Sequence, residues 1–101
     1  MLYHLVRPDD WARLGTGPTY VPDAYATEGF IHLSTAEQVP GVLARYFRGV
    51  PQVLKLHLDA AQVRTQLRYE PSTGGELFPH LYGPIPRAAI VQIERLDQAP
   101  S

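Results

Sequence analysis

The segment EGFIHLST, residues 28–35, decides how the rest of the chain is interpreted. Its residues alternate as in a β-strand, which places Phe30, His32 and Ser34 on one face of the strand. Ser34 and Glu37 have the spacing of a capping box, so we expect a helix to begin directly after this strand. The imidazole and the hydroxyls would then lie at a strand-to-helix junction, where backbone N–H groups lack partners. Either these groups bind a ligand there, or the hydroxyls only cap the helix and the histidine only packs in the core.

Bulk properties limit the classes of function. The 101-residue chain has the length of one domain, and we expect residues 1–101 to form it. The absence of cysteine excludes disulfides, thiol nucleophiles and zinc–thiolate sites. A formal net charge of −1 predicts no nucleic-acid partner, although a small nucleotide needs only a local cluster of donors. The chain starts without a signal-peptide pattern and has no apolar run long enough for a membrane, so we expect a cytoplasmic protein with no membrane partner.

Hydrophobic periodicity predicts several short strands and two helices. The strands span residues 2–6, 30–33, 53–58, 65–70 and 88–96, and the helices span residues 8–14 and 36–47. Pro40 lies inside the second helix and should loosen its start. The segment 15–28 is interpreted as a loop with one helical turn near residues 23–26. We expect the last strand to be central in its sheet, because Ile90, Val91 and Ile93 are all apolar.

The segment from Pro71 to Pro84 is too long for a simple hairpin connection. Its prolines, Pro79 among them, should prevent regular strand pairing. We nevertheless expect an ordered and packed loop, because several of its side chains are too apolar to stay in water. These side chains are Leu77, Phe78, Leu81 and Tyr82. Glu76 and His80 are the local side chains able to pair its backbone groups.

Familiar catalytic motifs are absent. The four histidines include no i, i+4 pair of the kind that binds zinc on a helix, so we expect no metal. Ser34 lacks the Gly-x-Ser-x-Gly pattern of a hydrolase elbow, and no glycine-rich phosphate loop is present. Histidines converging on a metal from separate strands stay an open alternative, as does a pairing of Ser34 with His32 or His80.

Three stretches of the chain together resemble the DUF952 family of small uncharacterised bacterial proteins. They are LYHLV at residues 2–6, EGFIHLST at residues 28–35, and above all RYEP at residues 68–71 followed by GGELFPHLYGP at residues 74–84. That family is distantly similar in fold to the ADP-ribosyltransferases. The resemblance therefore implies a single α+β domain with a mixed, largely antiparallel, split sheet and two or three short helices.

The same resemblance implies the location of a site. Proteins similar to the ADP-ribosyltransferases bind NAD in a cleft, with a histidine or arginine on the first strand, hydroxyls on the second and a glutamate later in the chain. The expected catalytic residues are therefore His4, His32 and Glu76. The expected ligand-binding residues are Ser34, Thr35, Glu70, Phe78, His80 and Tyr82. NAD or another nucleotide-like molecule would be the substrate.

Two functions are compatible with such a site. In an enzyme, a carboxylate would stabilise the oxocarbenium-like centre that forms as nicotinamide leaves. The alternative is a non-catalytic binding or regulatory module that keeps the cleft. The two functions differ in whether Glu76 or Glu70 lies within hydrogen-bonding reach of His4 and Ser34.

Overall fold

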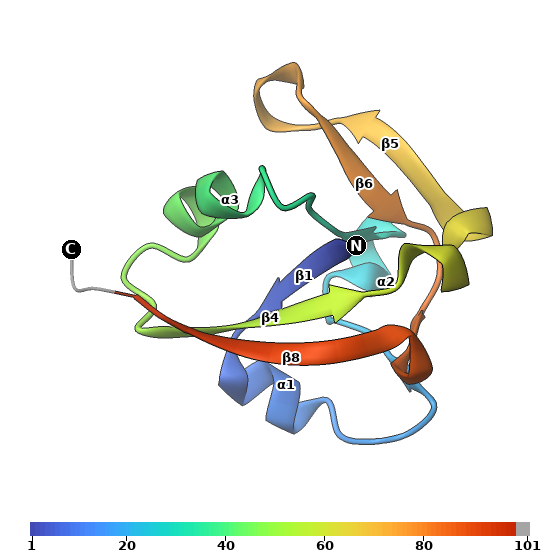
Figure 1. The fold of residues 1–101 in the computed structure, drawn as a ribbon, viewed down its shortest axis with the longest axis horizontal. Helices are drawn as coiled ribbons and strands as arrows, with labels where there is room; N and C mark the ends of the chain where they lie inside the picture. Colours follow the sequence, from blue (N-terminus) through green and yellow to red (C-terminus); the bar gives the residue numbers. More distant parts are fainter. Residues whose placement is uncertain (99–101) are drawn as a thin grey trace.

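A computed structural model describes residues 1–98, which form three antiparallel sheets and three α-helices. Figure 1 shows how these elements are arranged. The strands are β1 (Leu2–Val6), β2 (Thr19–Tyr20), β3 (Ile31–His32), β4 (Gln52–Leu58), β5 (Leu67–Pro71), β6 (Leu77–Leu81), β7 (Ile85–Pro86) and β8 (Ile90–Asp97). The α-helices are α1 (Pro8–Arg13), α2 (Tyr25–Glu28) and α3 (Val39–Tyr46). Short 3₁₀ turns are η1 (Ala60–Gln62), η2 (Arg64–Gln66), η3 (Thr73–Gly75) and η4 (Arg87–Ala89). The expected α+β class and the three short helices are confirmed, but the expected mixed sheet is wrong, because every strand pair in residues 1–98 is antiparallel and the strands form three sheets.

The first sheet has the strand order β1-β4-β8, with β4 in the middle. Strand β4 follows the predicted alternation, because Leu54, Leu56 and Leu58 are all buried. Leu2 and Val6 on β1 pair with the two outer leucines and belong to the same core cluster. Burying a leucine side chain stabilises the fold by about 2 kcal/mol. This face of the first sheet therefore forms the centre of the core.

Strand β8 is an edge strand, so the expectation that it is central is wrong. Its apolar residues Val91 and Ile93 are 55% and 48% exposed. The central position belongs to β4, which buries apolar residues on both faces. Leu56 faces the main core, whereas Val53 packs in a second cluster with residues of α3. A run of β-branched residues predicts a strand, but it does not determine how many neighbours that strand has.

The second sheet has the order β3-β6-β5, and its middle strand lies inside the segment predicted to be an unpaired loop. That expectation is wrong because Pro79 fits the ladder. Its carbonyl oxygen accepts a 3.0 Å hydrogen bond from the Leu33 N–H. The N–H that proline lacks would point to the same side, just past the end of the two-residue strand β3. The ladder therefore loses little by having proline there.

Packing of this segment follows the expectation only in part. Phe78 and Leu81 are buried, whereas Leu77 and Tyr82 are 54% and 38% exposed. Leu77 is the first residue of β6, next to the turn of the β5–β6 hairpin, which projects away from the rest of the molecule in Figure 1. Tyr82 follows the last residue of β6. Both side chains thus lie at the ends of a strand whose middle is covered.

Helix α3 begins at Val39 and not at Ala36, so the predicted capping box does not form. Ser34 is held instead by backbone pairing with β1, and residues 35–38 form a turn before the helix. Pro40 lies in the first turn of α3, where its missing N–H has no partner to lose. The proline therefore sets where the helix starts, which a capping pattern alone does not reveal.

The remaining boundaries shift by a few residues. The helical turn expected near residues 23–26 is α2, Tyr25–Glu28, and Gly29 ends it with a left-handed backbone at φ 81°. The strand expected at 65–70 begins at Leu67, because η2 precedes it. The third sheet, β2–β7, pairs Tyr20 with Ile85 inside the main core. No helix within residues 1–98 is long and apolar enough to cross a membrane.

The first and second sheets meet at a single isolated pairing between Tyr3 on β1 and Ser34 after β3. The Tyr3 N–H donates to the Ser34 carbonyl at 2.9 Å, and the Ser34 N–H donates to the Tyr3 carbonyl at 2.8 Å. Continued antiparallel pairing would bring Leu5 opposite His32. No backbone hydrogen bond joins those two residues within the described chain. The first and second sheets thus split apart between β1 and β3 beyond this contact.

Candidate functional site

His4 joins the two strands where the split begins. Its Nδ1 lies 2.9 Å from the carbonyl oxygen of His32, and its Nε2 lies 3.2 Å from the hydroxyl of Tyr20. A carbonyl only accepts, so Nδ1 carries the proton and Nε2 accepts from the Tyr20 hydroxyl. Both ring nitrogens of this predicted catalytic residue are therefore already used within the protein.

Burial keeps His4 neutral. Its side chain is buried, and desolvation lowers its pKa from 6.5 to about 4, although the hydrogen bond to His32 opposes this shift. Burial also raises the pKa of the Tyr20 hydroxyl. Both groups thus stay uncharged near neutral pH. His4 acts as a link across the split more than as a group free to exchange protons.

A cleft of about 580 Å³ opens beside this link, and we name it the first cleft. Its wall combines residues of β1, β3, α3 and the β5–β6 hairpin. The lining residues are His4, Leu5, Glu28, His32, Leu33, Ser34, Val42, Arg45, Tyr46, Phe47, Ser72 and Phe78. Four of the residues predicted from the sequence therefore lie around one cavity: His4, His32, Ser34 and Phe78.

His32 and Glu28 form an imidazole–carboxylate pair at this cleft. The Nε2 atom of His32 lies 2.8 Å from Oε2 of Glu28, and the His32 side chain is 51% exposed. The carboxylate can only accept, so Nε2 carries a proton in this contact. In the neutral ring Nδ1 is then left as a base with a free lone pair. This arrangement can accept a proton from a bound molecule.

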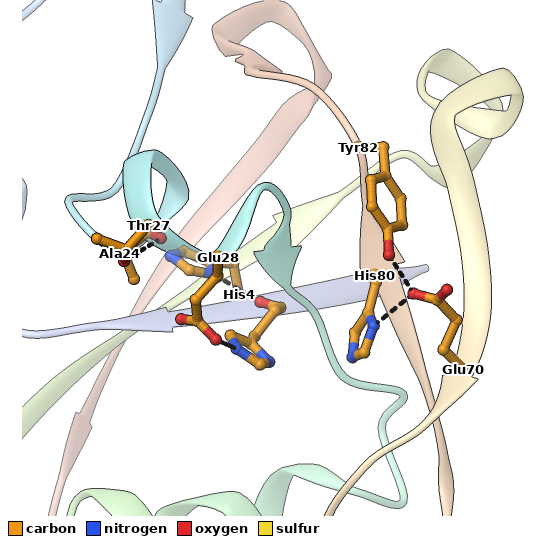
Figure 2. Close-up of polar contacts among 8 residues, drawn as sticks. His4, Ala24, Thr27, Glu28, Glu70, His80 and Tyr82 are labelled. Atoms are coloured by element: carbon orange, nitrogen blue, oxygen red, sulfur yellow. Dashed lines mark hydrogen bonds and ion pairs between the residues drawn. The ribbon is translucent and has the colours of Figure 1, made fainter.

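A second imidazole–carboxylate pair lies next to the first. His80 Nδ1 is 2.9 Å from Oε1 of Glu70, and the Tyr82 hydroxyl donates to the same oxygen at 2.5 Å, as Figure 2 shows. The rings of His32 and His80 are 5.4 Å apart, because the two residues are cross-strand partners on β3 and β6. Phe30 stacks on His80 at 4.1 Å. These contacts bring together Glu70, His80 and Tyr82 beside the first cleft, although none of the three lines it.

The hydrogen bonds of this second pair have electrostatic consequences. The hydrogen bonds from Tyr82 and His80 lower the pKa of Glu70, and the same carboxylate raises the pKa of Tyr82. The ionised Glu70 fixes the proton of His80 on Nδ1. The other nitrogen, Nε2, is buried and has no hydrogen-bond partner. A buried imidazole acceptor is thus held in one tautomer.

Thr35 and Glu76 lie outside the cleft and meet at Gln38. The Thr35 N–H donates to Oε1 of Gln38 at 3.0 Å, and the Gln38 side-chain amide donates to Glu76 at 3.1 Å. The same amide also donates to the Leu77 carbonyl at 2.8 Å. Within the described chain, no hydrogen bond links Glu76 or Glu70 to His4 or Ser34. The contact that was expected to distinguish an enzyme from a binding module, between one of these glutamates and His4 or Ser34, is therefore not made.

Three polar residues of the first cleft escaped prediction from the sequence: Glu28, Arg45 and Ser72. Glu28 is the first residue of the EGFIHLST segment, and its i, i+4 spacing to His32 indicates that the two side chains can pair. Arg45 lies on α3, and the strand alternation that predicted His32 and Ser34 does not show which helix residues face the cleft. Among the described residues, no group of three or more His, Cys, Asp or Glu side chains is placed to hold a metal ion.

Comparisons with known proteins identify the family. A family model described as a protein of unknown function, DUF952, matches residues 5–93. The crystal structure of protein CC0527 from Caulobacter crescentus is 29% identical, with a TM-score of 0.86 over 97% of this chain and 87% of that chain. The solution NMR structure of CC0527 gives a TM-score of 0.82 at 29% identity, over 97% of this chain and 85% of that chain. Comparison with curated proteins finds no match. With most of its length matched by the family model, the chain belongs to the DUF952 family.

Proposed function

We propose that this chain is a cytosolic protein whose first cleft binds a small nucleotide-like molecule, NAD or a related nucleotide. The observation that carries the proposal is the position of the Glu28–His32 pair in a cleft of about 580 Å³. Clefts of roughly 300–1,000 Å³ with apolar walls and a few polar groups are the usual form of small-molecule sites.

The lining supports a ligand with an aromatic part and an anionic part. Tyr46, Phe47 and Phe78 offer aromatic surface on which a base can stack. Arg45 lines the same cleft and suits a phosphate, because its guanidinium donates in a planar fork. A nucleotide combines these two parts.

The chemistry that fits the cleft is cleavage or transfer at the sugar of such a ligand. In this proposal, the Glu28 carboxylate would stabilise positive charge that develops on the sugar ring. His32, whose proton is held on Nε2 by Glu28, would take a proton from the attacking acceptor at Nδ1. The split between β1 and β3 is also consistent with an ADP-ribosyltransferase-like fold, which the sequence resemblance implies.

A non-catalytic binding module is the second candidate. It is favoured by the positions of Glu70 and Glu76, which are bonded to His80, Tyr82 and Gln38 and do not line the cleft. If neither glutamate acts, catalysis depends on Glu28 alone. The two functions share the ligand and differ only in turnover.

Thermal unfolding with a panel of nucleotides tests the binding step. Ligands that bind only the native state must raise the melting temperature, and we expect such a rise with NAD or a related nucleotide at millimolar concentration. Arg45→Ala should remove the rise, whereas Arg48→Ala, an exposed arginine outside the cleft, should leave it intact. A flat response across the panel would refute the proposal.

Release of nicotinamide from NAD separates the two candidates. An enzyme should release nicotinamide, and the Glu28→Gln variant should still bind NAD but no longer release nicotinamide. Binding without release, in the presence of peptide and small-molecule acceptors, would identify the non-catalytic module.

A further inference from the structure

The split sheet leaves part of β1 without a neighbour. Tyr3 uses its N–H and its carbonyl to bond Ser34, so both groups point away from β4. Along an extended strand these directions alternate, and Leu5 therefore points its N–H and carbonyl to the same open side. Arg7, with φ −72° and ψ 143°, continues the extended backbone. Among the described residues, no hydrogen bond reaches the Leu5 N–H, the Leu5 carbonyl or the Arg7 N–H.

A second cleft, of about 360 Å³, lies along this open edge. It shares His4, Leu5, Tyr46 and Phe47 with the first cleft and extends from there towards α1 and the segment before α2. The open donors and acceptor of β1 are spaced two residues apart, as in a strand ladder. The second cleft thus offers one strand edge without a hydrogen-bonding neighbour between walls of other elements, next to the Leu5 residue, which is 8% exposed.

The side chains around the edge define a pattern. Leu5 and Arg7 have the same parity on the strand and face the side on which Phe47 packs with Leu5. Arg13 in the same cleft is neutralised by Asp10 at 3.2 Å and Asp23 at 2.6 Å. No carboxylate pairs with Arg7 among the described residues. An added strand would therefore place an apolar residue opposite Leu5 and an acidic residue opposite Arg7.

We propose that the second cleft binds an extended peptide segment, which adds to the open edge of β1 as a strand and carries an acidic residue opposite Arg7. Pairing with an exposed strand edge is a recurrent mode of peptide recognition, in which backbone bonds give affinity and alternate side chains give specificity. The proposal does not depend on nucleotide binding in the first cleft. If that ligand is transferred, the peptide is placed beside it.

The probe is an acetylated and amidated hexapeptide in which glutamate and two valines alternate with threonines. It is titrated into the full chain without nucleotide while backbone amide signals are followed by NMR. We expect the Leu5 and Arg7 amide protons to shift on binding. The amides of His4 and Val6, which point to β4, should shift much less and serve as an internal control.

Two controls test the mode of binding. The same peptide methylated on the nitrogens that would pair should not bind. Arg7→Glu should weaken the glutamate peptide by roughly tenfold and make a lysine-substituted peptide the better ligand, because it replaces an attraction by a repulsion. Arg48→Glu should change neither peptide. The proposal is overturned by the absence of Leu5 and Arg7 shifts at millimolar peptide, by equal shifts at His4 and Val6, or by equal binding of the methylated peptide.

Discussion

The first and second sheets are built from different side chains, although both have three antiparallel strands. In the first sheet, the middle strand β4 contributes Leu54, Leu56 and Leu58 to the core. In the second sheet, the middle strand β6 carries His80 in a buried position, with Glu70 beside it on β5. The first sheet therefore mainly stabilises the fold, whereas the second sheet holds polar groups in fixed positions next to the cleft.

This difference explains what each sheet contributes to function. Apolar side chains pack without direction, so the leucines of the first sheet need only the right volume and pattern. Buried polar side chains need partners, and their hydrogen bonds fix the ring orientation of His80 and the tautomer it adopts. The cleft lies where the two sheets separate, and each sheet contributes a polar and an apolar residue to its lining: His4 and Leu5 from β1, and His32 and Phe78 from the second sheet.

The largest effect should come from truncating the middle of each sheet. Leu56→Ala removes a side chain with 0% exposure and should destabilise the domain by about 4 kcal/mol. Phe78→Ala should cost about 3 kcal/mol, because Phe78 borders the first cleft and water can fill part of the space. Denaturant unfolding measures both. A loss below about 1 kcal/mol for Phe78→Ala would show that the second sheet is not part of the cooperative core.

Stability should fall on mild acidification because of His4. Its pKa is about 4 in the folded protein and 6.5 ordinarily, so the unfolded chain binds the proton more tightly between these values. The contribution of neutral His4 to the free energy of unfolding is fully present above pH 6.5. It decreases by an amount on the order of 3 kcal/mol as the pH falls to 4 and below. Unfolding at several pH values tests this.

The control for the acid effect is His4→Gln, which removes the titrating group and keeps a side chain that can donate to the His32 carbonyl. The variant should be less stable at pH 7, and its stability should depend much less on pH between 4 and 6.5. An unchanged pH dependence in the variant would assign the effect to other groups.

A smaller effect is expected at the exposed end of the second sheet. Tyr82→Phe removes the hydrogen bond that contributes most to lowering the pKa of Glu70 below its ordinary value of 4.5. The pKa of Glu70 should rise in the variant, as followed by carboxyl carbon NMR. Because a lowered carboxyl pKa stabilises the fold above that ordinary value, less stability should be lost below pH 4.5 in the variant than in the natural chain. A Glu70 pKa that does not move would show that the hydrogen bond is absent in solution.

The sequence predicts the first sheet better than the second. Alternation in residues 53–58 identifies β4 and its buried face, because leucine at every second position fits a strand with all three leucines on one face. In β6, Pro79 argues against a strand, and only the shortness of β3 makes it acceptable. Where β3 ends relative to Pro79 depends on the tertiary structure, so the local sequence pattern cannot reveal it. The edge position of β8 likewise depends on the order of strands in the folded sheet, which the local pattern does not contain.

The candidate site follows the same division. His32 and Ser34 reach the first cleft because side chains two residues apart on an extended chain share a face, and Phe78 reaches it from β6. Arg45 reaches the cleft through the packing of α3, which begins at Val39 only because Pro40 fits its first turn. Glu76 is drawn away by Gln38, a contact between residues 38 positions apart. Such long-range partners depend on the fold and leave no mark in local spacing.

The most direct test of the first cleft as a ligand site is an NMR titration with NAD that follows the histidine ring nitrogens. We expect the His32 ring signals to shift in a saturable way. The ring of His57, which is bonded to Glu94 in the first sheet and lies outside both clefts, should stay unchanged. Equal shifts at both rings, or none at His32 up to millimolar NAD, would contradict the assignment of the cleft between the two sheets as the binding site.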